Sequence, residues 1–229
     1  MGLALLPFFQ FFRGTPHQLA AIKQLEESMP EELLAEDEAD WFQAWKESGY
    51  DQQIYMPYFR QWDNKTGTGY RECFSSAAAM VAAYYKKVRT DDEYNEIRAK
   101  YGDSTSVDAQ LAALRSLGLR AEFRKDGDAD LVEQELEAGR PVMVGWLHVG
   151  NMLLGEPPMC NALSCGHWSV ISGYAGKNSR DPEWIMQDPK GYPEMEKGGH
   201  SNPHLGRNVR VRQAAFHQRW QTEGPKSGW

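Results

Sequence analysis

The chain has 229 residues, which is enough for one well-packed domain and an additional segment. Its 41% of hydrophobic residues is typical of a globular protein, and no apolar run reaches the roughly 20 residues that span a bilayer. The formal net charge is −7, and residues 1–50 hold nine of the acidic residues against three basic ones. With no basic surface indicated, we expect neither a nucleic acid nor a membrane as a partner.

The first part of the chain is predicted to be an acidic helical segment, residues 1–49. Thr15-Pro16 is typical of a helix start, and Pro30 divides the pattern into helices near 16–28 and 31–47. The apolar start of the chain lacks a basic region and a small-residue cleavage site, so we do not expect a signal peptide. We therefore predict two parts, with the main domain in residues 50–229.

The main domain changes from helical to strand patterns along its length. We predict a central, alanine-rich helix from Cys73, and then helices at 91–101, 107–117 and 129–138. Strands are predicted at 119–124, 141–147, 167–174, 184–187 and 208–212. Helices first and antiparallel strands afterwards indicate an α+β fold.

Cys73 is the first candidate catalytic residue. It follows a loop rich in glycine and turn residues, and it stands at the predicted start of the central helix. Free N–H groups and the helix dipole favour an anion there, so we expect the pKa of the thiol to be lowered. A thiolate is the nucleophile that acyl transfer requires.

A thiol nucleophile requires a base and a group that orients the base. His167 begins one predicted strand, and Asp188 follows the next one in the sequence Met186-Gln187-Asp188-Pro189. Two antiparallel strands joined by a turn can bring these side chains together. The order Cys73, His167, Asp188 therefore predicts a catalytic triad, although each residue alone could have a purely structural role.

The oxyanion formed by attack on an amide requires hydrogen-bond donors. The backbone N–H of Cys73 is one candidate, and a neutral amide side chain upstream is the second. Gln61 lies twelve residues before Cys73, and Asn64 is the competing candidate.

The other cysteines, Cys160 and Cys165, leave two interpretations open. They could form a small disulfide or remain free thiols, or they could join His167 and either His148 or His200 around a zinc ion. Their spacing is looser than that of typical zinc sites, so we expect no metal and no cofactor. His200 and His204 are otherwise expected to be loop residues.

Four short sequences resemble the landmarks of the papain-like "C39-like" cysteine peptidases, which are related to bacteriocin-leader-processing peptidases. They are YFRQWDN, GYRECFSSAAAM, GHWSVISGY and WIMQDPKGY. The resemblance implies a papain-like fold in which the helix carrying the cysteine packs on a sheet carrying the histidine and the aspartate. It also implies Gln61 as the oxyanion donor, with Cys73, His167 and Asp188 as the triad. Phe74 occupies a position where that family commonly has glycine.

Three further segments are FFRGTPHQLAAIKQLEE, ADWFQAWKESG and RWQTEGPKSGW. Through them the whole chain is similar to proteins of cyanobacterial viruses that join an acidic helical segment to such a domain. That resemblance implies an endolysin-type or virion-associated peptidoglycan hydrolase, made in the host cytoplasm and acting at the cell wall or in the virion. A protease acting on a protein substrate is the first alternative. A non-catalytic virion or binding module that keeps the fold is the second. The expected partner is peptidoglycan or a peptide.

Overall fold

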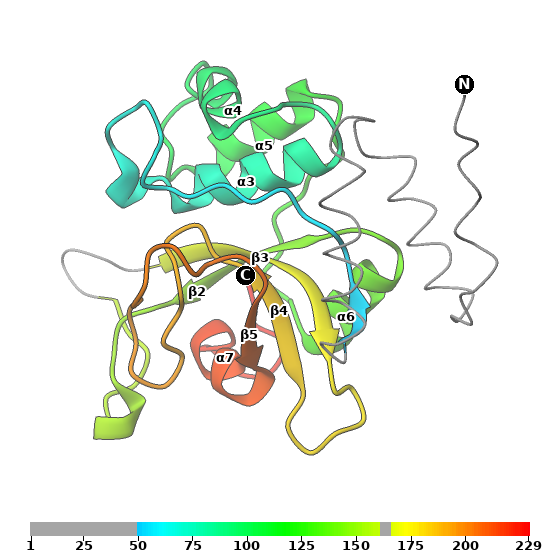
Figure 1. The fold of residues 1–229 in the computed structure, drawn as a ribbon, viewed down its shortest axis with the longest axis vertical. Coiled ribbons are helices and arrows are strands. Elements are labelled where there is room, and N and C mark those ends of the chain that lie inside the picture. The colour runs from blue at the N-terminus through cyan, green and yellow to red at the C-terminus, as the bar shows by residue number, and fades with distance from the viewer. Residues whose placement is uncertain (1–49, 161–165) are drawn as a thin grey trace, which may run out of the picture.

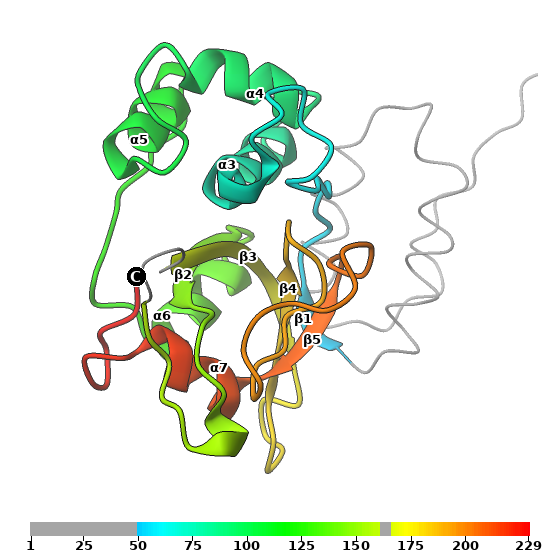
Figure 2. The ribbon, with the colours of Figure 1, turned by 90° about the vertical axis from the view of Figure 1, so that its left-hand side faces the viewer.

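The computed structural model describes residues 50–160 and 166–229. These residues form layers, with helices α3 to α5 above a sheet and helices α6 and α7 below it (Figures 1 and 2). The helices are α3 (Cys73–Tyr84), α4 (Asp91–Arg98), α5 (Val107–Ser116), α6 (Ala129–Glu137) and α7 (Gln213–Trp220). The strands are β1 (Tyr50–Gln53), β2 (Val142–Leu147), β3 (Gly166–Ala175), β4 (Glu183–Gln187) and β5 (Val209–Arg212). Two short 3-10 helices are η2 (Gly69–Arg71) and η3 (Met152–Leu154).

Strand β3 organises the antiparallel sheet. Its first part pairs with β2, and its last part lies between β1 and β4, which in turn pairs with β5. Eight of its ten residues are buried, and apart from His167 they are apolar, small or aromatic side chains that can pack on both faces. The start of β3 therefore pairs with β2, where His167 lies opposite Trp146, and the pairing with β4 begins at Val170.

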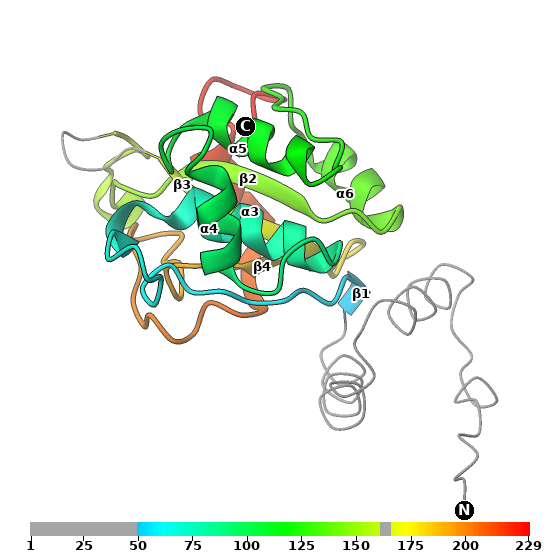
Figure 3. The same cartoon turned by 90° about the horizontal axis from the view of Figure 1, so that it is seen from above.

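Helix α3 packs on this sheet through small side chains. Ala77, Ala78, Ala79 and Ala82 have no exposed surface, and alanine lets a helix approach its neighbours closely. Met80 reaches the main core between α3, the sheet and the helices below it, whereas the alanines at 78, 79 and 82 face a second core with α4 and α5. Seen from above, the three helices cover the sheet (Figure 3). The helix that starts at Cys73 is therefore fixed from both sides.

The prediction of an α+β fold with a central cysteine-bearing helix on an antiparallel sheet is confirmed. The helices predicted from residue 91 to residue 138 and four of the five predicted strands are present within a few residues of their expected ends. The prediction of a strand at 119–124 is wrong. This segment pairs with no strand of the described residues, and the carbonyl of Ala121 accepts hydrogen bonds from the Arg115 guanidinium instead. The sequence pattern missed β1 and α7.

The predicted helices at 16–28 and 31–47 lie outside the described residues, and the division at residue 49 stays a prediction. Among the helices of residues 50–160 and 166–229, none combines the length and the apolar character that crossing a bilayer requires.

Candidate active site

Cys73 is the first residue of α3, as predicted. Helices α4, α5 and α6 each begin with a side-chain cap, from Thr90, Ser106 and Asp128 respectively. Helix α3 has no such cap, because the carboxylate of Glu72 accepts a hydrogen bond from Thr68 and lies 3.6 Å from Arg98. The first N–H groups of α3 are thus not occupied by a capping side chain, and they can receive an anion.

The residues that follow Cys73 and His167 hold the helix start against the sheet. The rings of Phe74 and Trp168 stack with centroids 3.7 Å apart and planes 3° from parallel. The backbone N–H of Trp168 also faces the Cys73 sulfur and favours its thiolate form. The thiol therefore lies beside the residue next to His167, although 94 positions separate Cys73 from His167 in the sequence.

The thiol does not have the low pKa that the helix start predicted. Cys73 keeps some exposed surface, yet burial of its sulfur raises the pKa of the thiol to about 11. The N–H groups of Trp168 and Phe74 oppose this rise but do not cancel it. The expectation considered only the local helix start, whereas the packing around the sulfur comes from distant parts of the chain. At neutral pH the thiol therefore keeps its proton until a base removes it.

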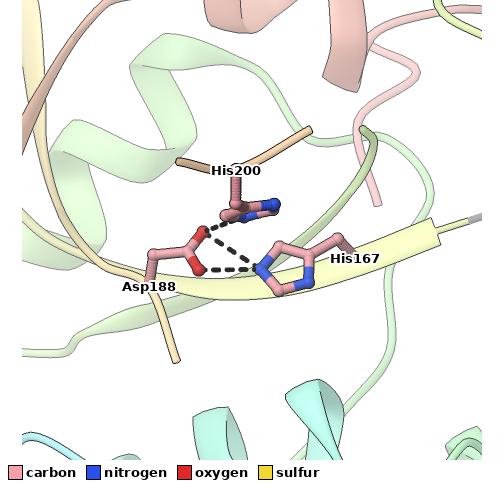
Figure 4. A group of neighbouring side chains, drawn as sticks. All are labelled: His167, Asp188 and His200. Atoms are coloured by element: carbon pink, nitrogen blue, oxygen red, sulfur yellow. Dashed lines mark hydrogen bonds and ion pairs between the residues drawn. The ribbon is translucent and has the colours of Figure 1, made fainter. Parts of the chain in front are cut away.

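His167 and Asp188 form a buried pair, as predicted. The imidazole Nε2 of His167 lies 2.9 Å and 3.0 Å from the two carboxylate oxygens of Asp188, and the residues are 1% and 0% exposed (Figure 4). His167 comes from the start of β3, and Asp188 directly follows β4. The second ring nitrogen of His167, Nδ1, points away from the carboxylate (Figure 4).

The charges of the pair follow from its surroundings. Burial alone would raise the pKa of the Asp188 carboxyl, but His167 and His200 and their hydrogen bonds outweigh it and hold that pKa well below its usual range. Burial lowers the pKa of the His167 imidazole to about 4, against the opposing influence of Asp188. At neutral pH an ionised Asp188 accepts from a neutral His167 that carries its proton on Nε2. Nδ1 is then free of a proton and can act as a base.

Further contacts hold Asp188 from its backbone and its side chain. Its N–H donates to the carbonyl of Gly206 at 2.7 Å, and its carbonyl accepts from the Tyr58 hydroxyl at 2.9 Å. A side chain at position 206 would come within 2.0 Å of that carbonyl, so the close approach requires glycine. The Ser169 hydroxyl donates to the Asp188 carboxylate at 2.9 Å and accepts from the indole N–H of Trp146 at 3.0 Å.

The two candidate amide side chains differ in their contacts. Asn64 is buried and uses its amide for structure, donating to the Gln61 carbonyl and to Ser76 and accepting from Asn95. Gln61 is 1% exposed and donates to the carbonyl of Gly69 at 2.7 Å, which uses one of its two amide hydrogens. The Gln61 backbone N–H donates to the carbonyl of Pro189, so this segment runs beside the turn after Asp188. The contacts favour Gln61 over Asn64 as an oxyanion donor.

The structure places beside Asp188 a histidine that the sequence did not indicate as catalytic, His200. Nε2 of His200 lies 3.2 Å from Oδ2 of Asp188, the oxygen that also lies 3.0 Å from Nε2 of His167 (Figure 4). The donor atoms of His167, Asp188 and His200 lie within 4.8 Å of one another, a spacing that could hold a metal ion. The direct hydrogen bonds already account for this arrangement. His204 is exposed and contacts Arg60 instead.

The predicted zinc alternative does not match these residues. Cys73 is the free cysteine of the part that the structure describes, whereas Cys160 is disulfide-bonded and so is not available as a thiolate ligand. Cys165 lies outside the described residues.

Comparison with known proteins decides the family. Residues 52–201 match the family model described as "Papain-like cysteine protease AvrRpt2", which covers more than half of the chain. The chain belongs to this family. It is therefore a cysteine peptidase, and the predicted papain-like family, fold and hydrolase class are confirmed.

The comparisons with solved structures and curated proteins add less about the family than the family model does. One solved structure similar to this peptidase is the crystal structure of a double glycine motif protease from an AMS/PCAT transporter in complex with the leader peptide. It has 20% identity and a TM-score of 0.41, and the match covers 74% of this chain and 88% of that one. No curated protein matches the peptidase.

Proposed function

We propose that the peptidase hydrolyses amide bonds of peptide substrates, with Cys73 as nucleophile, His167 as general base and Asp188 as the group that orients His167. The observation that carries this proposal is the buried His167–Asp188 pair at the start of β3, which the stacked rings of Phe74 and Trp168 hold beside the start of α3. The order Cys, His, Asp along the chain and the hydrogen bond between His167 and Asp188 support thiol-dependent acyl transfer.

The protonation states support a general-base mechanism. Nδ1 of His167 takes the proton of the Cys73 thiol while the sulfur attacks the substrate carbonyl carbon. The carbonyl oxygen becomes an oxyanion, which the backbone N–H of Cys73 and the second amide hydrogen of Gln61 would stabilise. The C–N bond then breaks as the imidazolium of His167 returns its proton to the leaving amine. A water molecule, deprotonated by His167, hydrolyses the thioester and regenerates the thiol.

Exposed aromatic side chains flank the site and support a peptide as substrate. Trp62, next to Gln61, is 46% exposed and donates through its indole N–H to the Lys190 carbonyl at 3.0 Å. Tyr70 and Tyr192 are 72% and 39% exposed, and they belong to the segments before Cys73 and after Asp188. Large exposed rings beside a catalytic centre are typical of surfaces that bind a partner.

A protein or peptide substrate agrees with the protease family of the chain. The peptidoglycan substrate, the viral origin and the action at a cell wall or in a virion stay predictions from the sequence resemblance. Both substrate classes contain amide bonds that the proposed residues could cleave, so the choice between them requires an experiment.

The test compares wild-type protein with Cys73→Ala on two substrates, a denatured protein mixture and purified peptidoglycan, with fragments identified by mass spectrometry. We expect new peptide termini from the wild type and none from Cys73→Ala, whose melting temperature should stay close to that of the wild type. Peptide fragments from peptidoglycan alone would assign the cell wall as substrate. Equal cleavage by both proteins would rule out Cys73 as nucleophile.

A further inference from the structure

Asp188 is shared by two imidazoles. The ring centroids of His167 and His200 are 4.5 Å apart with planes at 69°, and both rings direct Nε2 to the same carboxylate (Figure 4). The side chain of His200 is only 3% exposed. Its backbone is fixed as well, because residue 200 bridges to Pro193 and the preceding N–H, of Gly199, donates to the carbonyl of His148 at 2.6 Å. His200 is therefore a built part of the site.

The carboxylate of Asp188 is fully used by hydrogen-bond donors. Oδ1 accepts from His167 and from the backbone N–H of Lys190 at 2.9 Å. Oδ2 accepts from Ser169 and His200, and it also lies 3.0 Å from Nε2 of His167. An ionised carboxylate offers about four acceptor sites, so little capacity remains. As a donor to an anion, His200 carries its proton on Nε2.

The other nitrogen of His200, Nδ1, is buried and lacks a hydrogen-bond partner among the described residues. A buried acceptor without a partner typically costs about 1–3 kcal/mol, and an apolar side chain would avoid that cost. Stability of the fold therefore does not explain a histidine here, whereas its bond to Asp188 does.

We propose that His200 is a positioning residue that shares the Asp188 carboxylate with His167 and so keeps the protonated His167 acidic enough to return its proton to the leaving amine. This inference rests on the proposed function of the triad. A carboxylate with one imidazole partner would concentrate its attraction on His167 and make the imidazolium a weaker acid. When two imidazoles share the carboxylate, its attraction is divided between His167 and His200. The second hydrogen bond also prevents the Asp188 side chain from rotating.

The groups that face His200 are consistent with this role. They are Asp188 after β4, His167 on β3, and His148 after β2, whose ring centroid is 5.6 Å from that of His200. Lys190 lies in the turn after Asp188, and Trp146 of β2 packs at 5.7 Å without a charge. His200 acts to lower the pKa of His167, whereas Asp188 acts to raise it.

The decisive measurement is the pKa of His167, followed by NMR of labelled histidine side chains in a Cys73→Ala background. This readout does not require peptidase activity, so it separates failure of this inference from failure of the proposed function. Replacing His200 with Leu should raise the pKa of His167 by roughly half a unit or more. His200→Met is the second removal variant if Leu prevents folding, and His200→Gln, which keeps a donor, should restore much of the original value.

Kinetics of the protein with Cys73 intact give the second readout. We expect His200→Leu to lower kcat about tenfold with little change in KM and to move the pH–rate profile in the alkaline direction. His204→Leu is the matched control, because His204 belongs to the same loop but is exposed. An unchanged pKa of His167 in the folded removal variants, or a pH profile that His204→Leu reproduces, would overturn the proposal.

Discussion

Replacing Ser169 with alanine tests how the site is supported beneath the triad. The Ser169 hydroxyl links the Trp146 indole to the Asp188 carboxylate, and all three residues are fully buried. The variant leaves the Trp146 N–H without an acceptor, which typically costs about 1–3 kcal/mol, and removes a bond to a charged group worth about 1.5–3 kcal/mol. The hydroxyl itself no longer needs to be buried, which offsets part of this loss.

The expected net loss is about 2–3 kcal/mol in the free energy of unfolding, measured by urea denaturation. For a domain of this size it corresponds to a fall of roughly 4–12 °C in melting temperature. Ser201→Ala, an exposed serine after His200, is the control and should change stability by less than about 0.5 kcal/mol. A Ser169→Ala protein that melts within 1 °C of the wild type would refute the view that this hydroxyl supports the pair.

Three further predictions concern the other parts of the site. Gln61→Ala should lower kcat by about a hundredfold or more, and should also lower stability by about 1–3 kcal/mol because it leaves the Gly69 carbonyl without its donor. Asn64→Ala should lower stability with little direct effect on kcat, because Asn64 bridges three other residues. Because burial raises the pKa of the Cys73 thiol to about 11, iodoacetamide at pH 7 should alkylate Cys73 more slowly than a free cysteine. Burial lowers the pKa of His148 to about 3 and that of His167 to about 4, below the value of 6.5 in the unfolded chain. The unfolded chain therefore binds more protons on acidification, and the free energy of unfolding should fall as the pH drops from 7 to 5. Urea titrations should show a loss of about 1–2 kcal/mol for each histidine.

Each of these has an outcome that contradicts it. A large rate loss in Asn64→Ala with a normal rate in Gln61→Ala would reverse the assignment of the oxyanion donor. Fast alkylation at pH 7 would indicate a thiolate already formed at rest. In the pH series, burial of Asp91 raises its pKa to about 6 and acts in the opposite direction. The test is therefore the comparison with His148→Gln, which should lose less stability than the wild type on acidification.

The sequence predicted the parts of the site that lie at the ends of regular elements. Cys73 begins a helix, His167 is the second residue of a strand and Asp188 directly follows another strand, and each of these ends has a local signal in apolar periodicity and turn residues. The contact between His167 and Asp188 then follows from pairing consecutive antiparallel strands. Their catalytic roles stay predictions until the variants are measured.

What the sequence missed depends on contacts between distant segments. His200 lies in a loop of glycines and polar residues with no periodic pattern, and its bond to Asp188 exists because that loop turns back beside β4. The raised pKa of Cys73 likewise comes from burial beside β3, which a helix start does not reveal. Sequence patterns describe neighbours along the chain, whereas the electrostatics of a buried group depend on neighbours in space.

The stack of Phe74 on Trp168 has a consequence for how the molecule folds. It joins the first turn of α3 to the start of a strand that is itself paired on one edge by β2 and on the other by β4. Contacts between such distant positions form slowly, because a long loop must close before they gain any energy. During refolding, helical circular dichroism should therefore return before the ability to cleave a peptide. A refolding molecule would therefore be unable to cleave other, still unfolded copies of the chain until its own sheet has formed.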